Sequence, residues 1–105
     1  MDTLTRLERT IADRLGAGEA TSSYVAQLHA RGLPGIARKL GEEAVEAIVA
    51  ALSGQRDELI GEAADVLFHL LVLLGEKAVP FSEVLAELDR REGISGIDEK
   101  ARRTT

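Results

Sequence analysis

The chain has 105 residues and no cysteine, so it is long enough for one domain and offers no disulfide or thiolate chemistry. Its 13 basic and 18 acidic residues give a net charge of −5, which argues against non-specific binding to nucleic-acid backbones. Apolar residues make up 45% of the chain and aromatic residues 3%, a composition that predicts a folded protein with an aliphatic core of close-packed helices.

The chain shows no segment typical of targeting or membrane insertion. No basic stretch followed by an apolar core opens it, and the longest apolar run, residues 66–74, contains His69. That run falls well short of the ~20 residues that a membrane helix needs. We therefore expect a cytoplasmic protein, a single domain over residues 1–105, and no membrane partner.

The first predicted helix covers residues 3–16, where apolar residues repeat at helical spacing. Thr5 and Glu8 have the spacing of a capping box near its start. We expect the helix to pack against the centre of the fold through its apolar stripe. The stripe consists of Leu4, Leu7, Ile11 and Leu15.

Two longer helices follow in the middle of the chain. Ser23 is placed to cap a short helix, and after the break at 32–35 the main helix runs to Ser53-Gly54. The third helix is predicted from about Arg56 or Asp57 to Gly75. Beyond Asp65 it is apolar nearly all round, which is typical of a helix buried on several sides. A small monomer rarely buries a helix so fully, so we expect a homodimer that shares its core.

A last helix is predicted between Ser82, as its cap, and about Gly93. Its apolar residues are expected to face inward: Val84, Leu85 and Leu88. The remaining tail, residues 94–105, is polar, and we expect it to be mobile or to lie over a partner. Since no segment alternates as a strand does, the fold class is all-α, a bundle of four to five helices completed by dimerisation.

Acidic residues on the main and third helices form the candidate site. Residues three or four apart share a helix face, so Glu43 and Glu46 project together, as do Glu62 and Asp65. If the two helices pack antiparallel, the four carboxylates converge, and a bound cation would relieve their repulsion and desolvation. Oxygen-only ligands suit Mg²⁺ or Mn²⁺, as one ion or a pair. Solvated surface glutamates are the alternative, and the pattern alone favours neither.

Both acidic motifs also occur in a known family. The shared residues are Glu-Glu-x-x-Glu at 42–46, Glu-x-x-Asp at 62–65, Ser23-Tyr24, Lys39-Leu-Gly and Phe68-His69. In these residues the chain resembles the all-α nucleoside-triphosphate pyrophosphohydrolases of the MazG type. Within that superfamily the chain is similar to the phosphoribosyl-ATP pyrophosphatases of histidine biosynthesis, over most of its length. The resemblance implies Mg²⁺-dependent hydrolysis of phosphoribosyl-ATP to phosphoribosyl-AMP and pyrophosphate. It assigns the metal to Glu43, Glu46, Glu62 and Asp65.

The resemblance implies further roles around these ligands. Glu42 is expected to activate water or to support the metal ligands, and Lys39 to bind phosphate oxygens, with Arg38 and Arg56 as weaker candidates for the same work. Two interpretations are open for His69. As a site residue it would orient a carboxylate or contact the substrate; otherwise it is a hydrogen-bonded core residue.

The Ser-Tyr segment is expected to lie near the substrate in that family, which makes Ser23 and Tyr24 candidate substrate-binding residues. The threonine that usually follows is Val25 here, so no hydroxyl contact is expected from that position.

Two other functions remain compatible with the sequence. A house-cleaning pyrophosphohydrolase for another nucleoside triphosphate would use the same metal and mechanism with different base contacts. A non-catalytic helical dimerisation module would carry its glutamates as solubilising surface, and it predicts no specific binding of divalent metal.

Overall fold

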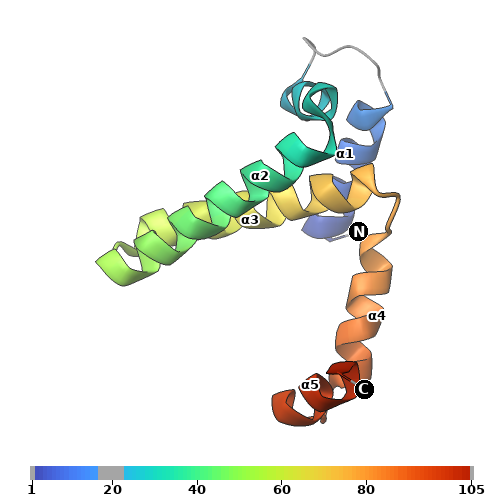
Figure 1. Ribbon diagram of the computed structural model, residues 1–105. Coiled ribbons are helices and arrows are strands. Elements are labelled where there is room, and N and C mark those ends of the chain that lie inside the picture. Colours follow the sequence, from blue (N-terminus) through green and yellow to red (C-terminus); the bar gives the residue numbers. More distant parts are fainter. Residues whose placement is uncertain (1, 17–22, 105) are drawn as a thin grey trace.

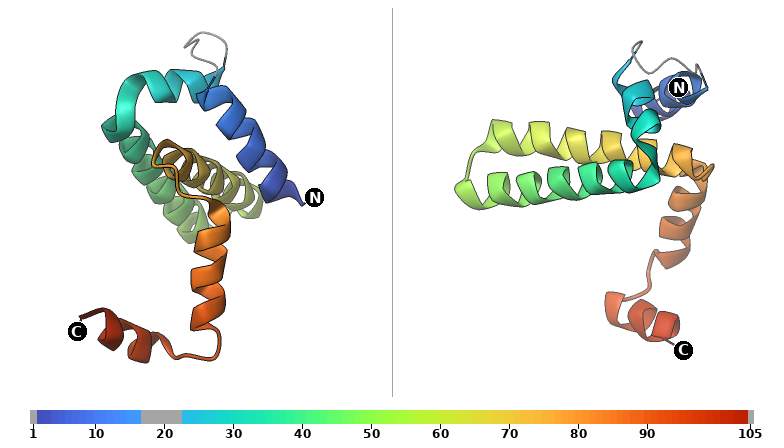
Figure 2. Two further views of the ribbon diagram at one scale, coloured as in Figure 1. Left: turned by 90° about the vertical axis from the view of Figure 1, so that its right-hand side faces the viewer. Right: turned by 45° about the horizontal axis from the view of Figure 1, so that its top comes forward.

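The structure, a computed structural model, describes residues 2–16 and 23–104, which form five α-helices and no β-strand. This confirms the all-α prediction. Helices α2 and α3 lie side by side as a long antiparallel hairpin, and α4 and α5 extend away from it (Figures 1 and 2). The helices are α1 (Thr3–Leu15), α2 (Tyr24–Ser53), α3 (Arg56–Glu76), α4 (Phe81–Arg91) and α5 (Gly96–Thr104).

The hairpin turn and a kink in α2 both depend on glycine. Gly54 ends α2 with a φ of 80°, in the left-handed region that favours glycine, and α3 begins two residues later. Gly32 has a φ of 81° and a ψ of 172°, so it interrupts the helical backbone inside α2. Pro34 then lies in the first turn of the next segment, where its missing N–H costs nothing. The break predicted at 32–35 is confirmed.

The short segment of α2 before the kink is fixed at both ends. The Ser23 hydroxyl accepts a hydrogen bond from the Ala26 N–H at 3.0 Å, as predicted for a cap. Near the other end, His29 Nδ1 lies 2.8 Å from Glu76 Oε2, at the end of α3. The His29–Glu76 contact holds the segment beside α3, and the cap fixes its first turn, which begins at Tyr24.

The core lies where α1 and the first part of α2 pack on the second half of α3. Each fully buried aliphatic side chain stabilises the fold by about 1.5–3 kcal/mol, so this crossing supplies most of the apolar stabilisation of the single chain. The buried cluster consists of Ile11, Val25, Leu28, Ile36, Leu71 and Val72.

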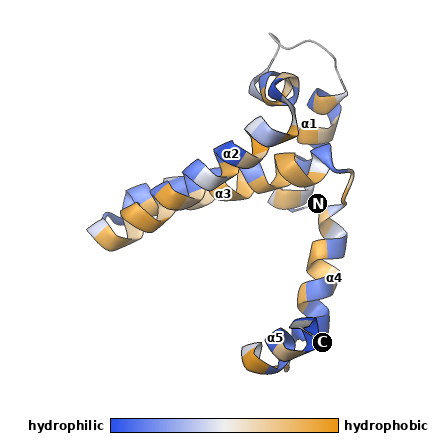
Figure 3. Cartoon of the chain, viewed as in Figure 1, coloured by the Kyte–Doolittle hydropathy of each residue, from blue (hydrophilic) through white to orange (hydrophobic). Residues whose placement is uncertain are grey.

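The far half of the hairpin carries many apolar residues (Figure 3), and the side chains of several of them are exposed to solvent. On α3 these exposed residues lie mostly before Asp65. Beyond Asp65 the helix is buried or half-buried within one chain except at Leu67 and Gly75, as predicted. Despite this apolar surface, none of the helices in the described ranges combines the length and the hydropathy needed to cross a membrane. We call this surface the hairpin face. It consists of Val45, Ile48, Val49 and Leu52 on α2 and Leu59, Ile60 and Leu67 on α3.

Two predicted helix caps are wrong. Asp2, not Thr5, caps α1, since the Asp2 carboxylate accepts a hydrogen bond from the Thr5 N–H at 2.8 Å. Glu8 instead reaches across the fold and accepts a hydrogen bond from the Phe81 N–H at 2.7 Å. Phe81 is the first residue of α4, so Ser82 lies inside the helix and does not cap it. The cap of α1 is therefore local but lies three residues earlier than predicted, whereas at α4 a tertiary contact takes the place of a local cap.

Helices α4 and α5 differ from the predicted inward-facing helix and polar tail. Leu85 and Leu88 are about half exposed, because α4 points away from the hairpin. The tail forms α5, whose first turn is capped by the Ser95 hydroxyl, which accepts a hydrogen bond from the Asp98 N–H. Glu99 is buried and accepts a hydrogen bond from Arg90 Nη2 at 2.6 Å, which ties α5 to α4.

Candidate metal centre

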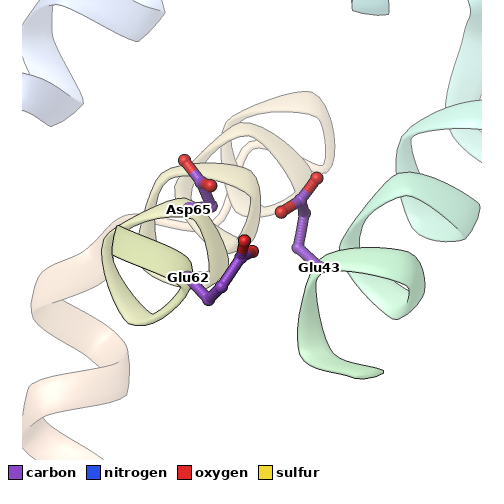
Figure 4. A group of neighbouring side chains, drawn as sticks. All are labelled: Glu43, Glu62 and Asp65. Atoms are coloured by element: carbon purple, nitrogen blue, oxygen red, sulfur yellow. The ribbon is translucent and has the colours of Figure 1, made fainter. Parts of the chain in front are cut away.

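Three carboxylates from two helices meet in the middle of the hairpin. Glu43 projects from α2, and Glu62 and Asp65 project from α3; one oxygen of each lies within 4.8 Å of the other two (Figure 4). Glu62 and Asp65 share a helix face because they are three residues apart. The antiparallel pairing of α2 and α3 then brings Glu43 opposite them. The convergence expected from the spacing thus occurs for three of the four predicted ligands.

Two oxygens of this group are buried without a hydrogen-bond partner. Glu43 is only 6% exposed, and its Oε2 has no partner; Oε2 of Glu62 is likewise buried and unpaired. A buried carboxylate oxygen with no donor is costly, and such groups are few in native proteins. The unpaired oxygens and the oxygen-only ligand set fit a hard divalent cation such as Mg²⁺.

The pKa values of these carboxyl groups reflect their crowding. Burial, followed by the neighbouring carboxylates of Glu46 and Glu43, raises the pKa of Glu62 to about 7. Burial also acts to raise the pKa of Glu43, but the hydrogen bond and charge of Lys39 outweigh it, so the pKa is lowered. Glu46 therefore lies beside the group and interacts with Glu43 and Glu62, although the close set of three does not include it.

Basic side chains border the group on α2. Lys39 Nζ lies 3.2 Å from Glu43 Oε1 and 3.8 Å from Glu42 Oε2, and Arg38 Nε lies 3.5 Å from Glu42 Oε1. The hydrogen bond to Glu43, together with the electrostatic interactions with Tyr24 and the two glutamates, raises the pKa of Lys39, which therefore stays charged. Glu42 is half exposed and contacts these two cations, outside the close set of carboxylates.

Tyr24 and His69 form a hydrogen-bonded pair next to Asp65. His69 Nδ1 lies 2.7 Å from the Asp65 carbonyl oxygen, which can only accept, so Nδ1 carries a hydrogen. In the neutral ring Nε2 then accepts from the Tyr24 hydroxyl at 2.9 Å. His69 is buried, and the rings of Phe68 and Tyr24 contact it edge-on. Both ring nitrogens therefore have protein partners, as the core-histidine alternative predicts.

The remaining predicted residues have distinct positions. The Ser23 hydroxyl is occupied by its cap, and Val25, 2% exposed, belongs to the core. Arg56 is the first residue of α3, at the tip of the hairpin.

Sequence reasoning missed Arg31, which lines a cavity of about 240 Å³. Its spacing from Arg38 and Lys39 gives no signal of a shared face, because the break at Gly32 interrupts the helical period between them. The other lining residues are Gly35, Arg38, Lys39 and Glu42.

Comparison with known proteins shows which proteins this chain is similar to. Residues 4–92 match the model of the family described as phosphoribosyl-ATP pyrophosphohydrolase. Proteins named phosphoribosyl-ATP pyrophosphatase are similar to nearly the whole chain. The one from Erythrobacter litoralis is 61% identical over 103 residues, 98% of each chain. Those from Novosphingobium aromaticivorans and Rhizorhabdus wittichii are 62% and 63% identical, over 96% of this chain and 94% of theirs. The chain therefore belongs to the phosphoribosyl-ATP pyrophosphohydrolase family.

Proposed function

We propose that this protein hydrolyses phosphoribosyl-ATP to phosphoribosyl-AMP and pyrophosphate, the second step of histidine biosynthesis. The printed names of its relatives support this activity, since they cover nearly the whole chain at about 60% identity. The observation that carries the proposal is the meeting of Glu43, Glu62 and Asp65, with two buried carboxylate oxygens left unpaired. A cytoplasmic location belongs to the same proposal, because the substrate is a biosynthetic nucleotide.

The carboxylates of Glu43, Glu46, Glu62 and Asp65 are the residues that would hold Mg²⁺, with Mn²⁺ as the alternative. When bound, the ion neutralises negative charge on the phosphate oxygens of the substrate. A carboxylate of this group accepts the proton of the water that attacks phosphorus in line with the leaving pyrophosphate.

The basic residues bind and orient the phosphates. Lys39 already lies 3.2 Å from Glu43, so its ammonium group is placed at the edge of the metal site, where it binds phosphate oxygens. Glu42 is expected either to activate water or to support the metal ligands. Its contacts with Arg38 and Lys39 favour the supporting role. Tyr24, held by His69, forms the adjacent wall toward the substrate.

The activity is tested by measuring pyrophosphate release from phosphoribosyl-ATP, with Mg²⁺ and with excess chelator, beside a panel of other nucleoside triphosphates. Metal-dependent turnover of phosphoribosyl-ATP is expected. Turnover of a different triphosphate would keep the site and change the pathway. A well-folded protein that turns over nothing would favour the helical dimerisation module.

The metal site is tested with Glu46→Ala and Asp65→Ala. Each should abolish turnover while the helical circular dichroism persists, because neither residue belongs to the buried core. Glu83→Ala removes an exposed carboxylate from α4 and serves as the control. Near wild-type activity in Asp65→Ala would contradict the metal assignment.

We also propose that the functional form is a homodimer in which a second copy covers the hairpin face. The face runs along the same two helices as the carboxylates, and Val45 and Val49 line a cavity of about 260 Å³ with Glu46 and Glu62. Two such hairpins packed face to face would form a four-helix bundle, and a two-fold axis lets the same surface serve both chains. The partner would then shield the metal site from solvent.

A further inference from the structure

The cavity beside Gly35 is bounded by positive charge. Arg31, Arg38 and Lys39 line it, and Glu42 is the single carboxylate in its wall. Its volume is about 240 Å³, and none of the three clustered carboxylates contributes to its lining. In a chain with a net charge of −5, this local excess of cations favours an anionic ligand.

Arg31 is available to bind that ligand. It is exposed, and none of the ion pairs found among the described residues includes it. The absent side chain of Gly35 makes room for it, since a Cβ at Gly35 would lie 2.9 Å from the Arg31 Cβ. The kink at Gly32 thus turns the preceding segment so that Arg31 lies against the helix that carries Arg38.

The substrate proposed above has anionic groups at two places: the triphosphate, and the phosphate of its phosphoribosyl group. The triphosphate must lie at the carboxylates, where hydrolysis occurs. Gly35 precedes Glu43 by about two helical turns, roughly 12 Å along α2, so the end of the cavity formed by Arg31 and Gly35 lies apart from that centre. Lys39, 3.2 Å from Glu43, lies at the other end, where the cavity meets the carboxylates. The arginine guanidinium groups suit a phosphate monoester because they form paired hydrogen bonds to its oxygens.

We propose that Arg31 and Arg38 bind the phosphate of the phosphoribosyl group, and so distinguish phosphoribosyl-ATP from ATP. This inference rests on the proposed function. It makes Arg31 a residue of substrate specificity, whereas the carboxylates and Lys39 act at the triphosphate.

The test uses calorimetric binding of three compounds to the full chain: phosphoribosyl-AMP, AMP and pyrophosphate. Wild-type protein should bind phosphoribosyl-AMP more tightly than AMP. Arg31→Gln should weaken binding of phosphoribosyl-AMP by about 10- to 100-fold, the usual worth of one charge-assisted contact, and leave AMP and pyrophosphate unchanged. Arg31→Lys should restore part of the loss. In turnover assays Arg31→Gln should raise KM with little change in kcat.

Arg14→Gln is the matched control, since Arg14 is an exposed arginine on α1 and does not line the cavity. Equal loss of pyrophosphate binding in Arg31→Gln would overturn the inference, because the cavity would then serve the triphosphate end. Unchanged binding of phosphoribosyl-AMP would overturn it as well. Because binding is measured without turnover, these outcomes are separate from a failure to hydrolyse phosphoribosyl-ATP, which would refute the proposed function.

Discussion

Replacing Ile48 by aspartate should dissociate the proposed dimer. Ile48 lies on the hairpin face and is 58% exposed in the single chain. Fully burying an isoleucine is worth about 1.5–3 kcal/mol, so covering the exposed 58% is worth ~0.9–1.7 kcal/mol per chain, or ~1.7–3.5 kcal/mol in a symmetric dimer. At 1.4 kcal/mol per factor of ten, this lost contact alone raises the dissociation constant roughly 20- to 300-fold. The two carboxylates introduced into the interface add a desolvation cost of several kcal/mol each.

Sedimentation velocity over a range of protein concentrations measures the effect directly. Wild-type protein should sediment as a dimer, and Ile48→Asp as a monomer at the same concentration. The variant should keep its helical circular dichroism, because Ile48 is not part of the buried cluster of the single chain.

Ile97→Asp provides the matched control. Ile97 is 83% exposed on α5, away from the hairpin, so this variant should remain dimeric. Dimers that persist in Ile48→Asp would refute the reasoning, as would a monomeric wild type. Dissociation by Ile97→Asp alone would place the interface on α5 instead.

Two further predictions concern single residues of the site. In metal-free protein the folded-state pKa of Glu62 is about 7 against an ordinary 4.5. The contribution of this raised pKa to the free energy of unfolding is therefore complete below pH 4.5 and is lost as pH rises through 7. Thermal unfolding in chelator should therefore show wild type losing stability relative to Glu62→Gln over that range, and parallel curves would contradict this. Ser23→Ala should cost about 1 kcal/mol through its lost cap, whereas Ser23→Asp should keep the cap and the stability. Activity lost in Ser23→Asp despite full stability would assign the hydroxyl to substrate binding.

Most of the fold could be predicted from the sequence because its signals are local. Gly54, the break at 32–35 and the Ser23 cap depend on residues close together in the chain, and each was located from those residues alone. The pairing of Glu62 with Asp65 likewise follows from helical spacing. Only the meeting with Glu43 required an assumption about tertiary structure, namely that the two helices are antiparallel.

The wrong predictions involve contacts between distant residues. Glu8 has a suitable spacing for a local cap, but it bonds to Phe81, 73 residues away. Arg31 escaped notice because the kink, not the helical period, brings it to the cavity. Leu85 and Leu88 form an apolar stripe, yet the hairpin lies out of reach of α4, so amphipathicity alone could not say what the stripe covers.

The pairing of α5 with α4 determines how the last part of the chain unfolds. No residue of α4 is buried, and the buried side chain of α5 is the charged Glu99, held by Arg90. On the same helix Arg90, followed by Arg91, lowers the pKa of Glu87 to about 2. Within α4 only Phe81, its first residue, packs against the core, so a unit held mainly by charge opens at a lower free energy than the packed crossing of α1 and α3. Backbone amides of α4 and α5 therefore exchange their hydrogens with solvent by local opening, while those around Val72 exchange only when the whole fold opens.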